Sequence, residues 1–285
     1  MLKKQSFTQE TPTVHLFRAG SCTHNEAMTI RGGQRKKVVF PALVALIEHP
    51  VHGRMLFDTG YAPRFFKETK KYPYKIYAQI TPVTCREEDT ALASLKKTGF
   101  DSGDIDYVFI SHFHADHISG LRDFPHSKFI YSKDAWKQVQ GKTGFSALLN
   151  GFLPGLMPDD FFDRAVEIHQ FAQKPYKHEK IPFDETLDLF GDEQVLAVSL
   201  PGHFSGQLGL IVNSENLGKI FLCADAVWHK QCFEENRLPH LLTALIHHSW
   251  PEYKRTVRQI RQFWKNNPEV KIIPTHCKKS QMEYF

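Results

Sequence analysis

The stretch Ser111-His112-Phe113-His114-Ala115-Asp116-His117 places three imidazoles and one carboxylate within six consecutive residues. It follows Tyr107-Val108-Phe109-Ile110, an apolar run of the kind that forms a buried strand. The cluster is therefore expected at the point where a strand leaves its sheet. Loops in that position are held by a rigid scaffold, and they carry binding residues more often than other segments do.

Neutral imidazoles and carboxylates are ligands for zinc, and also for iron and manganese. His112 and His114 are two residues apart, so in extended backbone both point to the same side and both could bind one ion. Asp116 and His117 follow and can face another way, which suits a second ion beside the first. The alternative is a polar loop that is histidine-rich by chance. The chain has 16 His, but three of them with an Asp at this spacing favour a metal site.

At these residues the chain resembles the metallo-β-lactamase superfamily, whose hallmark is His-X-His-X-Asp-His. The resemblance implies further residues at the ends of other strands, and the sequence contains each of them in the expected order. They are Asp58 in Phe57-Asp58-Thr59-Gly60, His203 in Pro201-Gly202-His203, Asp225 in Cys223-Ala224-Asp225, and His276 in Pro274-Thr275-His276.

The resemblance implies an α/β fold, a four-layer αββα sandwich of two mixed β-sheets with outer helices. It also implies a centre of two Zn²⁺ ions, with iron or manganese as alternatives. His112, His114 and His203 would hold one ion, Asp116, His117 and His276 would hold the other, and Asp225 would bridge them. Three of the carboxylates would have catalytic roles. Asp116 or Asp225 would carry a proton to the leaving group, and Asp58 would support the metal loop through hydrogen bonds.

Within the superfamily the chain is most similar to the lactonase and glyoxalase II-like hydrolases. The expected reaction is attack on an ester, lactone or thioester carbonyl by a hydroxide that bridges the two ions. One alternative is a phosphodiesterase or nuclease of the same fold, which would need a clearly basic groove. Others are a sulfur dioxygenase with mononuclear iron and a non-catalytic metal-binding protein, although the motif has lost none of its ligands.

Three residues are expected to contact the substrate. Trp228 lies three residues after Asp225, where related lactonases are expected to have a Tyr that polarises the substrate carbonyl. Because Trp has no hydroxyl, His229 is a candidate for the missing hydrogen-bond donor. An ordinary surface position for His229 is an equally good interpretation. Phe113, between the first two histidines, is the third.

The length of 285 residues and the spread of the motifs predict a single domain over 1–285, with a lid or insertion around 133–190. Residues 141–182 are rich in Phe and Leu. They are interpreted either as an apolar lid over an acyl chain or as a helical elaboration or dimer contact.

Other segments predict no chemistry. Residues 21–34, which contain Cys22-Thr23-His24, read as a loop, and residues 61–84 as a long surface excursion. His240, His247 and His248 are treated as ordinary, although one of them could reach the cleft.

The composition limits the classes of partner that we expect for this protein. A formal charge of +5 is mild, so a small-molecule substrate is expected and nucleic acid is not. No apolar run is long enough for a membrane span, and residues 1–10 lack the apolar core of a signal peptide. Five scattered Cys without a CxxC pair predict a reduced, cytoplasmic protein. The apolar segment 141–182 makes a homodimer a reasonable expectation.

Overall fold

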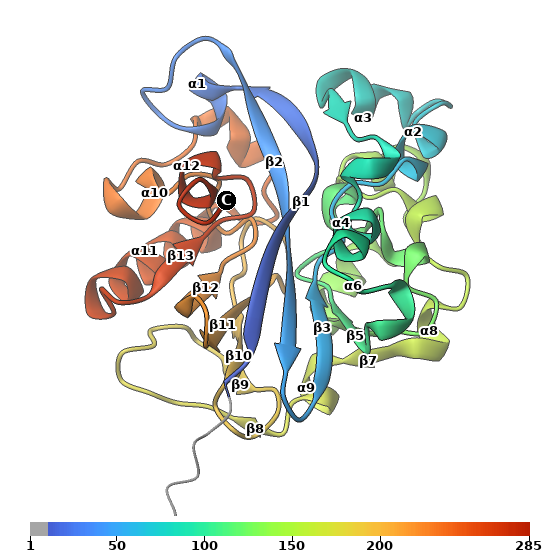
Figure 1. The fold of residues 1–285 in the computed structure, drawn as a ribbon. Coiled ribbons are helices and arrows are strands. Elements are labelled where there is room, and N and C mark those ends of the chain that lie inside the picture. Colours follow the sequence, from blue (N-terminus) through green and yellow to red (C-terminus); the bar gives the residue numbers. More distant parts are fainter. Residues whose placement is uncertain (1–10) are drawn as a thin grey trace, which may run out of the picture.

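Two β-sheets pack face to face between outer helices in the computed structural model, which describes residues 11–285 (Figure 1). The first sheet has the strand order β4-β1-β2-β3-β5-β6-β7, and the second has the order β13-β12-β11-β10-β9-β8. Both sheets are mixed, because parallel pairs such as β3–β5 and β12–β13 stand beside antiparallel hairpins. The predicted αββα sandwich is confirmed. The amino-terminal residues 1–10, on which the signal-peptide expectation falls, lie outside the described part.

The strands of the first sheet are β1 (Thr13–Asn25), β2 (Lys37–His49), β3 (Gly53–Phe57), β4 (Val83–Thr84), β5 (Tyr107–Phe109), β6 (Lys128–Tyr131) and β7 (Ala165–Glu167). Those of the second are β8 (Lys174–Pro175), β9 (Thr186–Asp188), β10 (Val195–Ser199), β11 (Leu208–Ser214), β12 (Gly218–Leu222) and β13 (Lys271–Ile273).

The helices are short except for one. They are α1 (Glu26–Thr29), α2 (Arg64–Glu68), α3 (Lys75–Ile80), α4 (Ala91–Lys97), α5 (Ala115–Ile118), α6 (Lys133–Val139), α7 (Gly144–Leu148), α8 (Phe161–Arg164), α9 (Ile168–Phe171), α10 (Gln231–Glu234), α11 (Trp250–Asn266) and α12 (Lys278–Gln281). Helix α11 begins at the Ser249 cap and packs Tyr253, Val257 and Ile260 onto the second sheet.

Strand β2 explains the layering, because it is apolar on both faces. Val44 and Leu46 face the helices that cover the first sheet, whereas Ala45 and Ile47 face the second sheet. A strand covered on both sides reads as a continuous apolar run instead of an alternating one. Strand β10 repeats the pattern from the other sheet, with Ala197 between the sheets and Val198 toward α11. The apolar core therefore forms three layers that alternate with the two sheets.

Two predictions about secondary structure are corrected. Strand β1 continues to Asn25, so residues 21–25, including Cys22-Thr23-His24, are a strand and not a loop. They pair with Lys37–Pro41 of β2 beyond an irregularity between Arg18 and Ser21. The segment 133–190 is built into the sandwich, because β7 forms one edge of the first sheet and β8 and β9 form an edge of the second.

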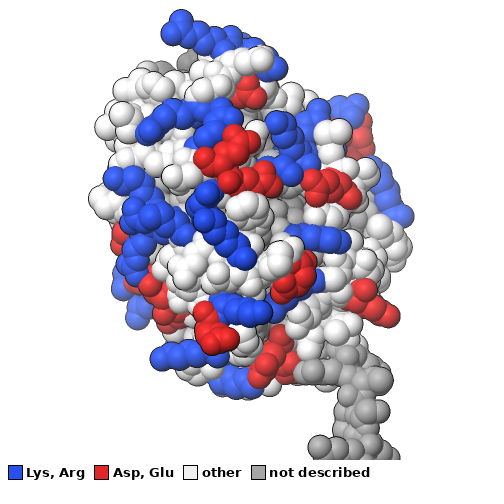
Figure 2. Space-filling view, turned by 90° about the vertical axis from the view of Figure 1, so that its left-hand side faces the viewer, with Lys and Arg blue, Asp and Glu red and all other residues white. Residues whose placement is uncertain are grey.

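On the face drawn in Figure 2, side chains of Lys and Arg are interspersed with those of Asp and Glu. Among residues 11–285, no helix combines the length and the hydropathy that a bilayer crossing needs.

Candidate metal centre

The seven expected ligands come from the ends of four strands and meet at one edge of the sandwich. Strand β5 leads into the loop with His112 and His114, and helix α5 carries Asp116 and His117 in its single turn. The loops after β10, β12 and β13 supply the others, which are His203, Asp225 and His276. Both sheets therefore contribute to the site, and the core between them fixes the distance from one half to the other.

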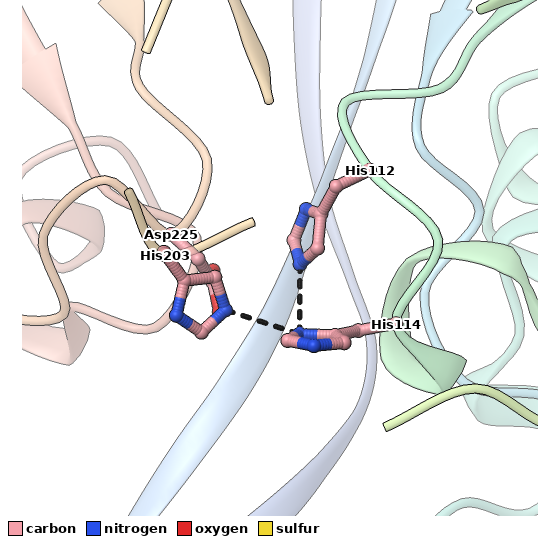
Figure 3. Close-up of side chains that lie close together, drawn as sticks. All are labelled: His112, His114, His203 and Asp225. Atoms are coloured by element: carbon pink, nitrogen blue, oxygen red, sulfur yellow. Dashed lines mark hydrogen bonds and ion pairs between the residues drawn. The ribbon is translucent and has the colours of Figure 1, made fainter. Parts of the chain in front are cut away.

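The first group contains His112, His114, His203 and Asp225, whose ligand atoms all lie within 4.8 Å of one another. Nδ1 of His114 lies 3.0 Å from Nε2 of His112 and 3.0 Å from Nε2 of His203. Figure 3 shows the two halves of this group pointing toward each other, with the rings of His112 and His114 on one side and His203 and Asp225 on the other. Three imidazole nitrogens and one carboxylate oxygen thus converge on one point.

The second group contains Asp116, His117, Asp225 and His276. Nε2 of His276 lies 3.1 Å from Oδ2 of Asp116 and 3.2 Å from Oδ2 of Asp225. Nε2 of His117 lies 3.5 Å from Oδ1 of Asp225. Asp225 belongs to both groups, so its carboxylate lies between the two points where ligand atoms converge.

The residues fit a pair of metal ions. Nε2 of His117 and Oδ1 of Asp225 are buried without a hydrogen-bond partner among the described residues. Such groups are costly to bury unless another ligand satisfies them. A set of nitrogen and oxygen donors without thiolate suits zinc, iron or manganese. The structure therefore supports the expected ligand sets, including the shared position of Asp225.

The pKa values differ between the two groups. In the first, burial holds the pKa of His112 and His203 well below the usual value and lowers that of His114 to about 4. In the second, burial alone would lower the pKa of His117, but Asp58, Asp116 and Asp225 outweigh it and raise the pKa to about 10. The pKa of His276 is likewise raised well above its usual value, because Asp225 and Asp116 outweigh burial.

Hydrogen bonds fix the orientation of several ligands. Asp58, with a left-handed φ of 57° after β3, accepts bonds from the backbone N–H and the hydroxyl of Ser111. Its Oδ2 also lies 2.7 Å from Nδ1 of His117. Nδ1 of His276 donates to the carbonyl of Pro41 at 2.9 Å. In His117 and His276, Nδ1 is engaged, so Nε2 is the atom left for a metal.

An open cleft of about 560 Å³ leads to the metal centre. Sequence reasoning missed one wall of it, the end of β1 with Cys22, Thr23 and His24, because the segment was interpreted as a loop. Burial raises the pKa of the Cys22 thiol to about 12, so the thiol is protonated in the metal-free protein, and Cys22 belongs to neither ligand group of the centre. Tyr61, fully buried beside the Asp58 turn, also lines the cleft.

Two of the three expected substrate contacts are corrected. Phe113 has no exposed surface and packs against Trp136 and Phe161, because alternation along the loop turns it away from its histidine neighbours. His229 does not line the cleft; its Nε2 lies 2.9 Å from the hydroxyl of Thr29. Trp228 does line the cleft, and its indole N–H donates to Oδ2 of Asp225 at 3.3 Å.

A third group of possible ligands, His49, His52 and Asp192, lies at the β2–β3 turn. Nδ1 of His49 accepts the backbone N–H groups of Val51 and His52, so the ring proton is on Nε2, the atom that faces Asp192 at 2.8 Å. A metal would have to displace that proton and reverse the tautomer. The group is therefore a structural contact that closes the turn.

Comparison with known proteins assigns the family. The model of the metallo-beta-lactamase superfamily matches residues 38–264. The N-acyl homoserine lactonase AttM of Azorhizobium caulinodans is 25% identical over 251 residues, which cover 87% of each protein. A Bacillus cereus N-acyl homoserine lactonase is 25% identical over 188 residues, covering 66% of this chain and 59% of that protein.

Solved structures have the same fold. An N-acyl homoserine lactone hydrolase with N-hexanoyl-L-homoserine bound at its catalytic metal centre superposes with a TM-score of 0.70 at 18% identity, covering 97% of this chain and 98% of that one. The dizinc quorum-quenching lactonase AidC gives a TM-score of 0.62 at 17% identity, and the match covers 94% of this chain and 89% of AidC.

The chain belongs to the metallo-β-lactamase superfamily. Within it, the protein is a metal-dependent hydrolase, and its two groups of ligands fit a binuclear metal site.

Proposed function

We propose that this protein opens the ring of lactones that carry an apolar acyl chain, with N-acyl homoserine lactones as the substrate class, and that its two metal ions are zinc. The observation that carries the proposal is the cleft. Its floor is formed by the metal ligands, and its volume of about 560 Å³ is within the usual range for small-molecule sites. Its walls include apolar side chains from five separate segments, namely Met28, Phe40, Ile80, Leu149 and Ile246.

When bound, the two ions supply an activated water and polarise the substrate carbonyl. The protein's own groups then handle the proton. In the metal-free protein, burial alone would raise the pKa of Asp116 and Asp225, but the cationic His117 and His276 outweigh it and keep both values below the usual range. In the loaded protein these imidazoles would be neutral ligands, and the metal ions would supply the neighbouring positive charge instead. Both carboxylates therefore remain ionised at neutral pH and can accept a proton. Asp116, at the cleft, is the proposed carrier to the leaving alcohol, and Asp225 holds the shared position.

The relatives support the substrate class, because AttM and AidC are lactonases by name and share the fold over most of the chain. We also propose a cytoplasmic location, which is supported by the five cysteines, all buried and free. The homodimer stays a prediction, as do the roles of Trp228 as a substrate contact and of residues 141–182 as an apolar lid.

The test is a substrate panel with the purified protein, together with elemental analysis. The panel contains N-acyl homoserine lactones of several chain lengths, a thioester, a phosphodiester and a β-lactam. About two zinc per chain and turnover of the lactones would support the proposal. Asp116→Ala should abolish turnover and leave the fold intact, whereas Asp163→Ala, on the exposed face of α8, should not alter it.

Three results would contradict the proposal. Wild-type turnover by Asp116→Ala would exclude the proposed proton carrier. Cleavage of the phosphodiester alone would favour the phosphodiesterase alternative. One iron per chain with oxygen consumption on a persulfide would favour the dioxygenase.

A further inference from the structure

We propose that His247 is a positioning residue that holds the metal ligand His203 in the tautomer that binds through Nε2. This role is not readable from the sequence, because His247 lies in no motif and precedes α11 in a stretch with two other histidines. The inference rests on the metal centre of the proposed function. Its test measures metal binding, so it can fail independently of the substrate.

The two nitrogens of His203 have different neighbours. Nε2 faces the first group of ligands, 3.0 Å from Nδ1 of His114 and 3.5 Å from Oδ2 of Asp225. Nδ1 faces the opposite way and lies 3.0 Å from Nδ1 of His247. Both histidines are buried, so no bulk water competes for the contact. Among the described residues, the contact with His247 is thus the only hydrogen bond that Nδ1 of His203 makes.

One proton must lie between the two Nδ1 atoms, because two neutral acceptors would repel each other and two donors would clash. If His203 carries it, Nε2 of His203 has a free lone pair for a metal. If His247 carries it, the proton of neutral His203 moves to Nε2, where it would face the metal position. Metal binding therefore selects His203 as the donor and His247 as the acceptor, which is the arrangement expected for a supporting partner of a ligand.

The surroundings of His247 keep its ring in place. Its ring stacks on Tyr253 with centroids 4.1 Å apart, and on Trp228 and Trp250 at 5.3 and 5.4 Å. The backbone is fixed too, since the N–H of His248 donates to the carbonyl of His203 and the N–H of Ser249 donates to that of Gly202. The start of α11 thus fastens the acceptor to the loop that carries the ligand.

The same ring also supports the bridging carboxylate. Trp228 stacks on His247 on one side and donates its indole N–H to Asp225 on the other. His247 therefore contacts a ligand of the first ion directly and reaches the shared ligand through one side chain. Loss of this acceptor should weaken the first metal position more than the second.

Two substitutions separate the hydrogen bond from the packing. His247→Phe keeps an aromatic ring in the stack but leaves Nδ1 of His203 without an acceptor. His247→Asn loses the ring but can place its amide oxygen near the position of Nδ1. His248→Phe, at an exposed neighbouring side chain, is the matched control.

Zinc affinity is measured by competition with a chromophoric chelator, on protein whose fold is checked by circular dichroism. We expect His247→Phe to reduce the zinc affinity of the first metal position by roughly tenfold to a hundredfold and to change that of the second position less. His247→Asn should recover part of that loss, and His248→Phe should bind as the wild type does. In the zinc-loaded wild type, the Nδ1 proton of His203 should give a slowly exchanging imidazole NMR signal that His247→Phe loses.

Wild-type zinc affinity for both equivalents in folded His247→Phe would overturn the proposal. A larger loss in His247→Asn than in His247→Phe would also overturn it, because packing and not the hydrogen bond would then be what matters. Loss of affinity in all three variants would point to disruption of the whole loop and would equally contradict a specific role for His247.

Discussion

Oδ2 of Asp58 lies 2.7 Å from Nδ1 of His117, and both side chains are completely buried. This contact joins the end of β3 to helix α5, two segments that are 59 residues apart in the sequence. Since Asp58 also accepts two bonds from Ser111, its carboxylate holds both ends of the histidine-rich loop. The loop is therefore positioned by a residue that belongs to neither group of metal ligands but contacts the ligand His117 directly.

Asp58→Asn should weaken metal binding while the protein still folds. An amide has one acceptor oxygen where the carboxylate has two, so one of the three donors around it loses its partner. Loss of a supporting partner of this kind typically reduces metal affinity by roughly tenfold to a hundredfold. Chelator competition measures the change, with Asp163→Asn on the exposed face of α8 as the control. Unchanged affinity in folded Asp58→Asn would show that the loop holds its shape without this charge.

Gly151→Ala should disturb the first metal position. A Cβ atom at Gly151 would lie 2.6 Å from Cδ2 and 3.0 Å from Nε2 of His114, and the backbone has a φ of +59°. Gly144→Ala is a matched control, because its φ is +57° but its Cβ would meet nothing within 4 Å. Each variant should lose about 1 kcal/mol of stability from the left-handed backbone.

Only Gly151→Ala should also lose zinc affinity, since only its methyl group displaces a ligand. Thermal unfolding of the metal-free proteins measures the shared backbone effect, and chelator competition measures the specific one. Equal zinc affinity in the two variants would mean that His114 moves aside without cost.

Loading with zinc at pH 7 should release at least two protons per chain. In the metal-free protein the pKa of His117 is about 10 and that of His276 is well above its usual value, so both rings are protonated at pH 7. A metal ligand must be deprotonated, and zinc affinity should therefore rise with pH through this range. Calorimetric titration in buffers of different ionisation enthalpy counts the protons. Release of fewer than one would mean that the carboxylates do not hold these imidazoles charged.

The same shifts fix the sign of a stability change in the metal-free protein. A pKa raised from 6.5 to about 10 means that folding favours protonated His117. Its stabilisation is complete below pH 6.5 and is lost as the pH rises toward 10. The melting temperature of the metal-free protein should thus fall between pH 7 and 10, and zinc-loaded protein should not follow this fall. Metal-free protein with a constant melting temperature across this interval would contradict the shift.

The metal ligands could be predicted from the sequence because each one ends a strand, and strand ends carry local signals such as Phe221-Leu222 before Asp225. The sandwich was implied by the family resemblance that these motifs carry. The end of β1 could not be predicted, since Cys22-Thr23-His24 is polar and became a strand only through pairing with β2. His247 was missed for a related reason. Its role depends on the docking of the α11 start against the His203 loop, which no local pattern encodes.

Trp228→Tyr should raise lactone turnover. Trp228 lines the cleft, and its indole N–H is engaged with Asp225 at 3.3 Å. We expect that a Tyr hydroxyl in its place would reach the substrate carbonyl. A well-placed donor to a developing oxyanion is worth on the order of a hundredfold in kcat, so even a partly aligned hydroxyl should give a measurable gain. Trp228→Phe is the control, because it has a ring of similar size and no donor. A gain in kcat in the Tyr variant alone would place residue 228 beside the reacting carbonyl. Equal rates in wild type and both variants would mean that this side chain only shapes the wall of the cleft.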